Sequence, residues 1–572
     1  MTSAHDNSFE NNFNKPWFAT YQCYGISPNI HMPNKDTSLI DILEKTMQNH
    51  PNRIASLSMG RAFTYRELDL TSRTVAAYLQ ELGLVKGDKV AIMLPNVIQY
   101  TIVAVAVLRA GLILVNVNPL YTSRELEHQL QDAEAKAIFI LENFAHTYQA
   151  VSPTLVEYVI MCRVGDMLGK VKGTLVNFGA KYIKKMVPDW QIKQFSWFSD
   201  VLKSNPALYQ RPDLTLEDTA LLQYTGGTTG VAKGAMLTHG NLIANILQID
   251  ALVDTSFTQE EREREHVILT ALPLYHVFAF TICCLYVFRM GYTQLLIANP
   301  RDLDAIVKDI NRYSLTFFIG INTLFNALVH HPKFREADFA KLKVTIAGGM
   351  SVNSNVAEEW HRITDTIIVE GYGLSECSPV VAFNPIRIEH FTGKIGIPAS
   401  STDVVLLDDD ERPVALGERG EIAVKGPQVM KGYHNAPTET LTAFSKTGYF
   451  KTGDIGVMDD KGFIKLVDRK KEMILVSGFN VYPNEIEEVI MQHPDILECG
   501  VIGVPSDSSG EVPKVFAVRK NSQLTEQALL NYAKENLTGY KRPRKVEFVD
   551  SLPKSAVGKV LRKELRALEK KE

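Results

Sequence analysis

Helix-like and strand-like patterns alternate along most of the chain. From about Ser38, stretches with helical spacing of apolar residues, such as 65–83, alternate with short β-branched runs, such as KVAIML at 89–94. Similar runs recur at 136–141, 266–272, 315–320, 343–349 and 367–373. This alternation is typical of an α/β fold in which helices flank mostly parallel sheets. Several of the runs end in glycines, and such folds bind ligands beyond the carboxyl ends of their strands.

The pattern changes after about Gly393. Residues 393–467 alternate in the manner of strands and are joined by turns rich in Asp and Gly, which predicts an antiparallel meander or small β-barrel. The charged run DRKKE at 468–472 follows, and then a mixture of helical and strand patterns. We therefore predict a large N-terminal domain over 1–467 and a small α+β C-terminal domain over 468–572.

Length and composition agree with this division. The 572 residues exceed the roughly 250 to 300 at which a single core stops growing, so at least two domains are expected. With 45% hydrophobic residues, 22% charged residues and a net charge of -4, the composition is that of a globular protein and suggests no nucleic-acid partner. The six cysteines include no CxxC pair, which argues against a disulfide framework or a zinc site.

Two features bear on location. The N-terminal segment is polar and acidic, so it does not resemble a secretory signal. The most apolar window, Ala271 to Phe288, approaches the length of a membrane span but contains Pro273 and His276 and is followed by Arg289. We expect this window to be buried core, the chain to lack a transmembrane helix, and the protein to be cytoplasmic.

The strongest local motif is LLQYTGGTTGVAKG at 221–234. Its glycines allow the backbone to approach an anion closely, its threonines donate hydrogen bonds, and Lys233 adds a positive charge. A purely structural turn would not require three Thr and one Lys among its glycines. The loop is not a Walker A motif, because Lys233 is followed by Gly234 instead of Ser or Thr. The pattern predicts a phosphate site.

Two acidic residues follow strand-like runs. In EGYGLSE, Glu376 offers the carboxylate oxygens that Mg²⁺ prefers, and Tyr372 offers a face for stacking a base. The alternative for Glu376 is a helix cap or a surface pair. Asp454, in a turn between strands, has the right chemistry to accept hydrogen bonds from ribose hydroxyls, but an ordinary Asp is equally expected in a TGD turn.

Five segments together resemble the adenylate-forming superfamily of acyl-CoA synthetases, adenylation domains and luciferases. They are the glycine-rich loop, PLYH at 273–276, EGYGLSE at 370–376, YFKTGD at 449–454 and LPKSAVGKVLRKEL at 552–565. Their order and spacing match over nearly the whole chain. Within the superfamily, the stretch at 468–490 with GPQVMKGY, VIGVPS and LTGYKRPRKVEF looks most like bacterial long-chain fatty acid-CoA ligase.

The resemblance implies roles for individual residues. Lys559 is similar to the lysine that bridges the substrate carboxylate and the α-phosphate, and Asp468 to a hinge about which the C-terminal domain rotates. The implied catalytic residues are Lys559, Glu376, Thr225 and His276, with Glu376 and Thr225 as metal ligands. The implied ATP or AMP contacts are Tyr224, Thr225, Gly226, Gly227, Thr228, Thr229, Gly230, Lys233, Gly349, Gly371, Tyr372, Gly373, Leu374, Ser375, Asp454, Arg469 and Lys559.

The other two substrates have their own implied residues. For the acyl group these are Tyr275, His276, Gly320, Thr323, Gly348 and Gly349. For coenzyme A, which binds after the domain rotates, they are Ser477, Gly478, Phe479 and Arg542. A solvated basic patch is the alternative explanation for Arg542 and its basic neighbours.

The reaction implied is activation of a long-chain fatty acid by ATP to acyl-AMP, with Mg²⁺ as cofactor, followed by transfer to coenzyme A. One alternative is a fatty acyl-AMP ligase that loads a separate carrier protein. A second is a nucleotide-responsive lipid-binding protein without catalysis, which the joint presence of Glu376, Asp454 and Lys559 argues against.

A basic amphipathic segment lies at 169–190. It places Leu175, Phe178, Tyr182 and Met186 on one helical face, with Lys172, Lys181, Lys184 and Lys185 largely elsewhere. Such a helix is suited to peripheral contact with the inner face of the cytoplasmic membrane, and an ordinary packed surface helix is the alternative. A homodimer is compatible with the sequence, which does not fix the oligomeric state.

Overall fold

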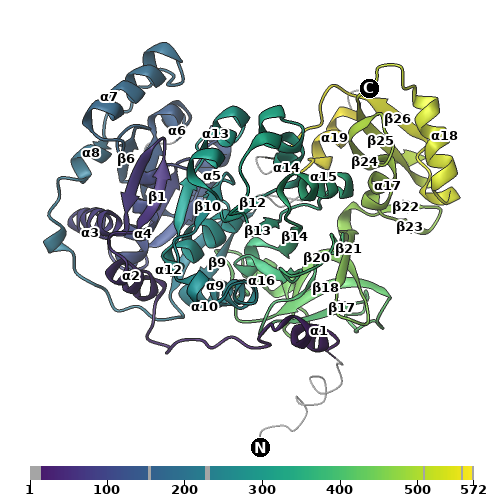
Figure 1. Ribbon diagram of the computed structural model, residues 1–572, viewed down its shortest axis with the longest axis horizontal. Coiled ribbons are helices and arrows are strands. Elements are labelled where there is room, and N and C mark those ends of the chain that lie inside the picture. The colour runs from purple at the N-terminus through teal and green to yellow at the C-terminus, as the bar shows by residue number, and fades with distance from the viewer. Residues whose placement is uncertain (1–14, 152–155, 226–231, 507–508, 556–557, 570–572) are drawn as a thin grey trace, which may run out of the picture.

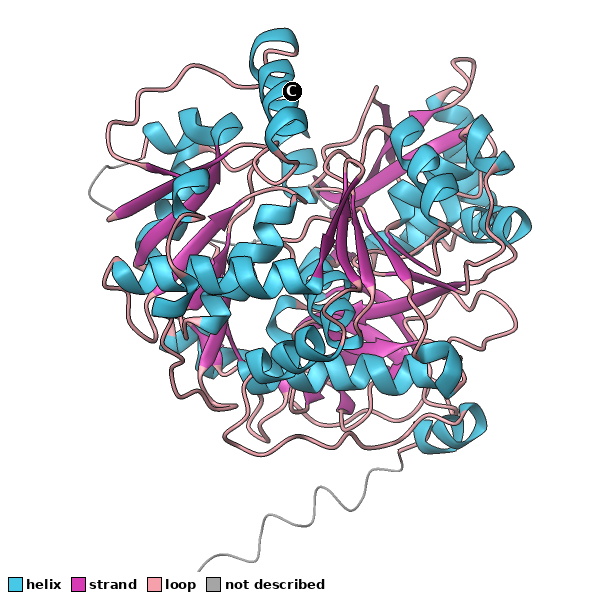
Figure 2. Ribbon diagram, turned by 60° about the vertical axis from the view of Figure 1, so that its left-hand side comes forward, coloured by secondary structure: helices cyan, strands magenta, loops and turns pink. Residues whose placement is uncertain are grey.

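The computed structural model describes residues 15–151, 156–225, 232–506, 509–555 and 558–569. Two large sheets flanked by helices form the N-terminal domain, and a smaller α+β unit follows it (Figures 1 and 2). The α/β class predicted from the alternating pattern is therefore confirmed.

The first sheet has eight strands in the described part of the chain. In order across the sheet they are β19 (Gly432–Tyr433), β9 (Lys233–Thr238), β8 (Thr219–Thr225), β4 (Ile113–Asn116), β3 (Lys89–Met93), β5 (Ala135–Leu141), β6 (Tyr158–Cys162) and β7 (Ser196–Trp197). Pairing is parallel from β8 to β7 and antiparallel at β8–β9 and β9–β19.

The second sheet has nine described strands. In order they are β16 (Ile397–Pro398), β15 (Val380–Phe383), β14 (Ile368–Gly373), β13 (Val344–Ala347), β12 (Phe317–Gly320), β10 (Val267–Thr270), β11 (Thr293–Leu296), β1 (Ile54–Ser58) and β2 (Arg61–Thr64). The centre, from β14 to β1, is parallel. The carboxyl ends of its parallel strands therefore lie along one edge, which is where α/β folds bind ligands.

Helices pack on and between these sheets. The principal ones are α2 (Leu39–Asn49), α3 (Tyr65–Glu81), α4 (Ile98–Arg109), α5 (Ser123–Ala133), α7 (Lys170–Phe178), α9 (His239–Asp254), α13 (Leu303–Tyr313), α14 (Asn322–Val329) and α15 (Ser354–Thr364). A capping box starts α3, because Thr64 accepts from the backbone N–H of Glu67 and Glu67 accepts from that of Thr64. All residues of α4 are buried, as expected for a helix that is apolar on every side.

The apolar window from Ala271 to Phe288 is core, as predicted. Its residues between Phe280 and Tyr286 form one π-helical segment, and all of them are buried. Among the residues that the structure describes, no helix has both the length and the apolarity needed to cross a membrane.

An antiparallel sheet links the two parts of the molecule. Its four strands are β17 (Asp403–Leu407), β18 (Arg419–Lys425), β20 (Phe450–Met458) and β21 (Ile464–Arg469), paired in that order. The antiparallel character predicted for 393–467 is confirmed, and in the described pairing β17 and β21 stand at the two edges. Because β21 ends at Arg469, the predicted hinge residue Asp468 lies in the last strand before the C-terminal unit.

The C-terminal unit has the α+β content that was predicted. Its described sheet contains β23 (Phe479–Val481), β22 (Ile474–Val476), β25 (Gly510–Arg519), β24 (Ile496–Ser506) and β26 (Lys545–Phe548). The helices are α17 (Pro483–Ile490), α18 (Glu526–Asn536) and α19 (Arg562–Glu569). Its core, which includes Ile486, Val501 and Leu529, is separate from the core of the N-terminal domain.

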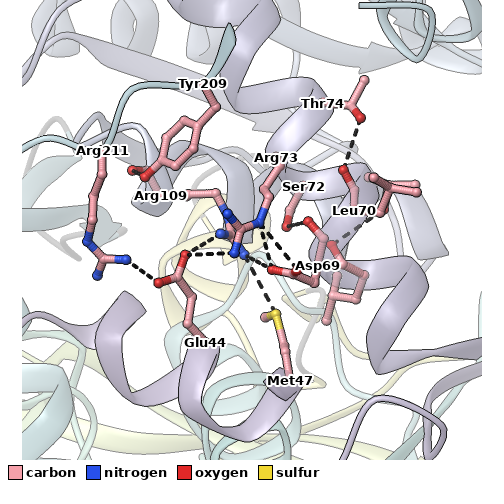
Figure 3. Close-up of polar contacts among 12 residues, drawn as sticks. Glu44, Met47, Asp69, Leu70, Ser72, Arg73, Thr74, Arg109, Tyr209 and Arg211 are labelled. Atoms are coloured by element: carbon pink, nitrogen blue, oxygen red, sulfur yellow. Dashed lines mark hydrogen bonds and ion pairs between the residues drawn. The ribbon is translucent and has the colours of Figure 1, made fainter. Parts of the chain in front are cut away.

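A buried ion network joins α2, α3 and α4 (Figure 3). The side chain of Arg109, at the end of α4, is fully buried and pairs with Glu44 of α2 and with Asp69 of α3, whose Oδ1 lies 2.8 Å from Nη2. Glu44 also pairs with Arg211 from the loop that precedes β8. A buried charge is tolerated only where it is paired. The network therefore constrains how these three helices pack against one another.

We predict that Arg109→Met destabilises the N-terminal domain by about 1.5–3 kcal/mol, because Glu44 and Asp69 lose their fully buried partner and keep only the more exposed Arg73 and, for Glu44, Arg211. Urea denaturation followed by tryptophan fluorescence would measure the loss. Arg264→Ala is the control, since it removes an exposed i,i+4 pair with Glu260 and should leave the midpoint unchanged. Equal midpoints for Arg109→Met and the native protein would contradict the prediction.

Candidate active site

A cavity of about 2550 Å³ lies where the carboxyl ends of the sheet strands, the antiparallel sheet and the C-terminal unit meet. It exceeds the roughly 300–1,000 Å³ of a single-ligand pocket, so it has room for several groups at once. Many of the predicted site residues line it: Tyr224, Thr225, Lys233, Tyr275, His276, Thr323, Gly349, Gly371, Tyr372, Gly373, Leu374, Ser375, Glu376, Asp454, Asp468, Arg469 and Lys559.

The predicted phosphate loop connects β8 to β9. Thr225 and Lys233 face each other as the last pair of this hairpin, and both line the cavity. Gly226, Gly227, Thr228, Thr229 and Gly230 lie outside the described residues.

Tyr372, Asp454 and Arg469 form one group, joined by a hydrogen bond and an ion pair. The Tyr372 hydroxyl donates to Asp454 Oδ2 at 2.6 Å, and Arg469 Nε lies 2.9 Å from Asp454 Oδ1. Asp454 and Arg469 are also paired in register on β20 and β21, so the sheet itself sets their spacing. Asp454 is buried, and its carboxylate has a cation on one side and a phenol on the other.

Glu376 is held by a residue that the sequence did not single out. The hydroxyl of Tyr433, on the short edge strand β19, donates to Glu376 Oε1 at 2.8 Å. The ammonium group of Lys233 lies 5.1 Å from the centre of the Tyr433 ring. Tyr433 thus connects the end of the phosphate loop to the predicted metal ligand, and no pattern in the sequence brings the three together.

Lys559 enters the cavity from the C-terminal unit. Its neighbour Gly558 is pressed against the N-terminal domain, because a Cβ atom there would lie 2.6 Å from Thr323 Oγ1. Lys559 is exposed to the solvent of the cavity, which residues of both domains line. Desolvation in the cavity and the charge of Arg469 lower the pKa of Lys559 to about 8.

Asp468 has its backbone in one domain and its side chain in the other. Its backbone pairs with Ile455 in the antiparallel sheet. Its carboxylate accepts from the backbone N–H of Asn484 at 2.7 Å and from Arg562 Nη1 at 3.1 Å. Arg562 also donates to Glu487 at 2.8 Å, so one guanidinium connects the predicted hinge residue Asp468, α17 and the start of α19. Sequence reasoning missed Arg562, which sits among other basic residues.

The acyl-site predictions divide into two groups. Tyr275, His276, Thr323 and Gly349 line the cavity, whereas Gly320 and Gly348 do not appear on its surface. These two glycines make room for aromatic rings, because an added Cβ would lie 2.8 Å from Phe325 and from Phe278 respectively. Burial lowers the pKa of His276 to about 4, so its imidazole is neutral at pH 7.

The predicted coenzyme A residues do not reach the cavity in this structure. Ser477 and Gly478 form the left-handed turn between β22 and β23, and Phe479 stacks on Tyr540 with ring centres 4.7 Å apart. Arg542 donates to the carbonyl of Leu537 at 2.8 Å. A role for these residues in coenzyme A binding therefore requires a different orientation of the C-terminal unit, and it stays a prediction.

Glu370 is a further cavity residue that was not predicted. It is buried within β14, where Oε1 accepts from the backbone N–H of Val352 at 2.9 Å. Oε2 has no hydrogen-bond partner among the described residues. Burial raises the pKa of Glu370 to about 7. The only signal available in the sequence was an acidic residue inside the otherwise apolar strand-like run at 367–373.

Two family models and several named relatives match the chain. The model of the AMP-binding enzyme family matches residues 43–434, and that of the AMP-binding enzyme C-terminal domain matches residues 485–559. A protein of Escherichia coli O157:H7 named long-chain-fatty-acid–CoA ligase is 50% identical over 93% of this chain and 95% of its own length. A protein of the same name from Yersinia pestis is 51% identical with the same coverage.

The fold has solved counterparts. The crystal structure of ATP-bound MatB from Rhodopseudomonas palustris aligns with a TM-score of 0.81 and 27% identity, covering 93% of this chain and 99% of that one. The site joins predicted nucleotide-binding residues of one domain to a lysine of a second, and the two family models cover these same two parts of the chain. The chain belongs to the AMP-binding enzyme family.

Proposed function

We propose that the protein is a long-chain fatty acid-CoA ligase that forms AMP. In the first half-reaction a fatty acid carboxylate attacks the α-phosphorus of ATP, giving acyl-AMP and pyrophosphate. In the second, the thiolate of coenzyme A attacks the acyl carbon and AMP leaves. The observation that carries the proposal is that Lys559 from the C-terminal unit enters the same cavity as Glu376, Asp454 and Arg469.

These residues supply charge and position. A lysine at the α-phosphate would stabilise the negative charge that develops as pyrophosphate leaves. Asp454, held between Tyr372 and Arg469, presents a fixed acceptor for ribose hydroxyls. No side chain is needed as a covalent nucleophile, so catalysis rests on binding geometry and electrostatic stabilisation.

The cavity suits Mg²⁺ held mainly by its substrate. Among the described residues no cluster of three or more His, Cys, Asp or Glu is found that could hold a metal by itself. Glu376 offers one carboxylate oriented by Tyr433, which matches the usual way Mg²⁺ binds through one or two carboxylates and nucleotide phosphates. When bound, Mg²⁺ would neutralise phosphate charge beside Glu376 and Thr225.

The acyl chain would lie on the side of the cavity lined by Tyr275, Ile321 and Thr323. Each buried CH₂ contributes about 0.8 kcal/mol to binding, so an apolar wall is sufficient to favour long chains. The names of the two relatives at 50% and 51% identity support this choice of substrate. We place the protein in the cytoplasm, where ATP and coenzyme A are available, and a homodimer stays a prediction.

The function is tested with the purified chain, MgATP and fatty acids of increasing length. We expect AMP formation that depends on a long fatty acid, and acyl-CoA when coenzyme A is added. Acyl-AMP without transfer to coenzyme A would favour loading of a carrier protein. The absence of any fatty-acid-dependent AMP or pyrophosphate would rule out the proposed reaction.

We predict that Lys559→Ala lowers the rate of adenylation about 10²- to 10³-fold, because one preorganised donor at the developing charge is lost. The measurement is pyrophosphate–ATP exchange driven by fatty acid, which reports the first half-reaction alone. Lys534→Ala, at an exposed lysine on α18, is the control and should exchange at the native rate. Native exchange in Lys559→Ala would remove Lys559 from the mechanism.

The lowered pKa of Lys559 predicts an alkaline limit. Since the charged amine is required and is lost as pH rises through about 8, kcat/KM for ATP in the exchange assay should fall above that pH. The Lys559→Arg variant keeps a positive charge at alkaline pH, so its kcat/KM should not fall above pH 8, whatever the absolute rate of the variant. A native profile that stays flat to pH 10 would show that Lys559 keeps the pKa of an ordinary lysine.

Tyr433→Phe should raise the Mg²⁺ concentration for half-maximal exchange about tenfold, because Glu376 loses the hydroxyl that orients it. Tyr158→Phe is a matched control, since it also removes one tyrosine hydrogen bond, to the carbonyl of Leu82, far from the cavity. If both variants needed the same Mg²⁺ concentration, Tyr433 would have no part in positioning the metal ligand.

A further inference from the structure

An exposed apolar surface lies at the end of the molecule opposite the C-terminal unit. It is formed by α7 and the following helical turn at Gly179–Ile183, which project from the edge of the N-terminal domain (Figure 1). The exposed apolar side chains are Val171, Leu175, Phe178, Tyr182, Ile183 and Met186. Each is more than half exposed, and together they are a third of all the large exposed hydrophobic residues in the described chain. Such clustering marks an interaction site.

The same segment is strongly basic. Residues 167–188 contain five lysines, at 170, 172, 181, 184 and 185, and no Asp or Glu. The chain as a whole has a net charge of -4, so this end of the molecule opposes the overall charge. Exposed apolar side chains among lysines are the composition of helices that lie in the interface of a bilayer.

The back of the segment is packed firmly. The backbones of Gly165 and Gly173 touch, because a Cβ atom on Gly173 would lie 2.3 Å from Gly165 O. Asn177 Oδ1 accepts from the backbone N–H of Gly165 at 2.8 Å, and Asn143 donates to Met186 O at 2.9 Å. Val187 is buried. The outward apolar face is therefore a formed surface of the fold and not a loose end.

Tryptophans lie beside this surface. A pocket of about 310 Å³ next to Lys181 is lined by Trp190, Trp197, Pro188, Asp189 and Arg163. The Arg163 guanidinium lies 3.5 Å from the centre of the Trp197 ring. Both tryptophans are half-buried, and tryptophan is the residue that anchors proteins at the boundary between lipid headgroups and acyl chains.

We propose that α7 and residues 179–186 form a docking surface for bilayers that contain anionic phospholipids. The apolar side chains would enter the headgroup region while the lysines contact lipid phosphates. A second copy of the chain is the weaker occupant, because a two-fold interface would bring five lysines against five lysines. The inference rests on surface chemistry and does not depend on the proposed reaction, although long-chain fatty acids also partition into bilayers.

The test is co-sedimentation of the full-length protein with vesicles. One set contains phosphatidylcholine alone, and the other contains three parts phosphatidylcholine to one part phosphatidylglycerol. We expect binding to the anionic set only. Each lysine near an anionic surface is worth about fivefold in partitioning, so the triple variant Lys181→Glu, Lys184→Glu and Lys185→Glu should bind at least about 100-fold more weakly.

A matched control distinguishes the effect of this surface on vesicle binding from the effect of the net charge of the protein. The triple variant Lys45→Glu, Lys341→Glu and Lys534→Glu changes the net charge equally at exposed sites elsewhere and should largely keep binding. A second variant, Phe178→Asn with Ile183→Asn, keeps the lysines and should also lose binding. Thermal melting and AMP formation with a water-soluble fatty acid check that each variant is folded.

Three results would overturn the proposal. The first is equal vesicle binding by the native chain and the Lys181, Lys184 and Lys185 variant, and the second is no binding of the native chain to anionic vesicles. The third is a native dimer that Phe178→Asn with Ile183→Asn makes monomeric, which would assign the surface to self-association. Loss of fatty-acid-dependent AMP formation with intact vesicle binding would count against the proposed reaction alone.

Discussion

The contact between Arg562 and Asp468 is the constraint on which the assembled site depends. Asp468 belongs by its backbone to the antiparallel sheet and by its side chain to the C-terminal unit. Arg562 closes this contact and stands only three residues after Lys559. Burial alone would lower the pKa of Arg562, but the carboxylates of Glu487 and Asp468 raise it above its usual value. The position of Lys559 is therefore set by a paired, largely buried cation at the predicted hinge.

This arrangement suits a domain that moves as one body. Asn484, Glu487 and Arg562 all lie beyond the hinge, so the clamp on the Asp468 side chain can travel with the C-terminal unit. Rotation would then be taken up by backbone torsions around Asp468, as is usual for hinges of a few residues at the end of an element. The same rotation would withdraw Lys559 from the cavity and change what Ser477, Gly478 and Phe479 face.

Sequence patterns predicted the secondary-structure elements, which have local periodic signals, and missed the side-chain pairs that form only by tertiary contact. The strands at 89–93, 317–320 and 368–373 were predicted because each is a β-branched or aromatic run between helical patterns. Asp454 and Arg469 were found by resemblance, but their register across β20 and β21 was not. Tyr433 and Arg562 were missed because their partners are 57 and 94 residues away in the chain. Such pairings leave no periodic signal in one sequence.

Positive charges are arranged differently in the cavity and on the proposed docking surface. In the cavity, Arg469 is paired with Asp454, and desolvation by the cavity walls together with the charge of that same arginine lowers the pKa of Lys559. Binding of an anionic substrate would stabilise the protonated form of such a lysine, because the negative charge of the substrate raises the pKa of the amine. On α7 and residues 179–186 the lysines are exposed and act together through their combined field, which weakens with added salt. The charge of Lys559 in the cavity therefore responds to one ligand, whereas the lysines at the opposite end of the molecule respond together to an extended anionic surface.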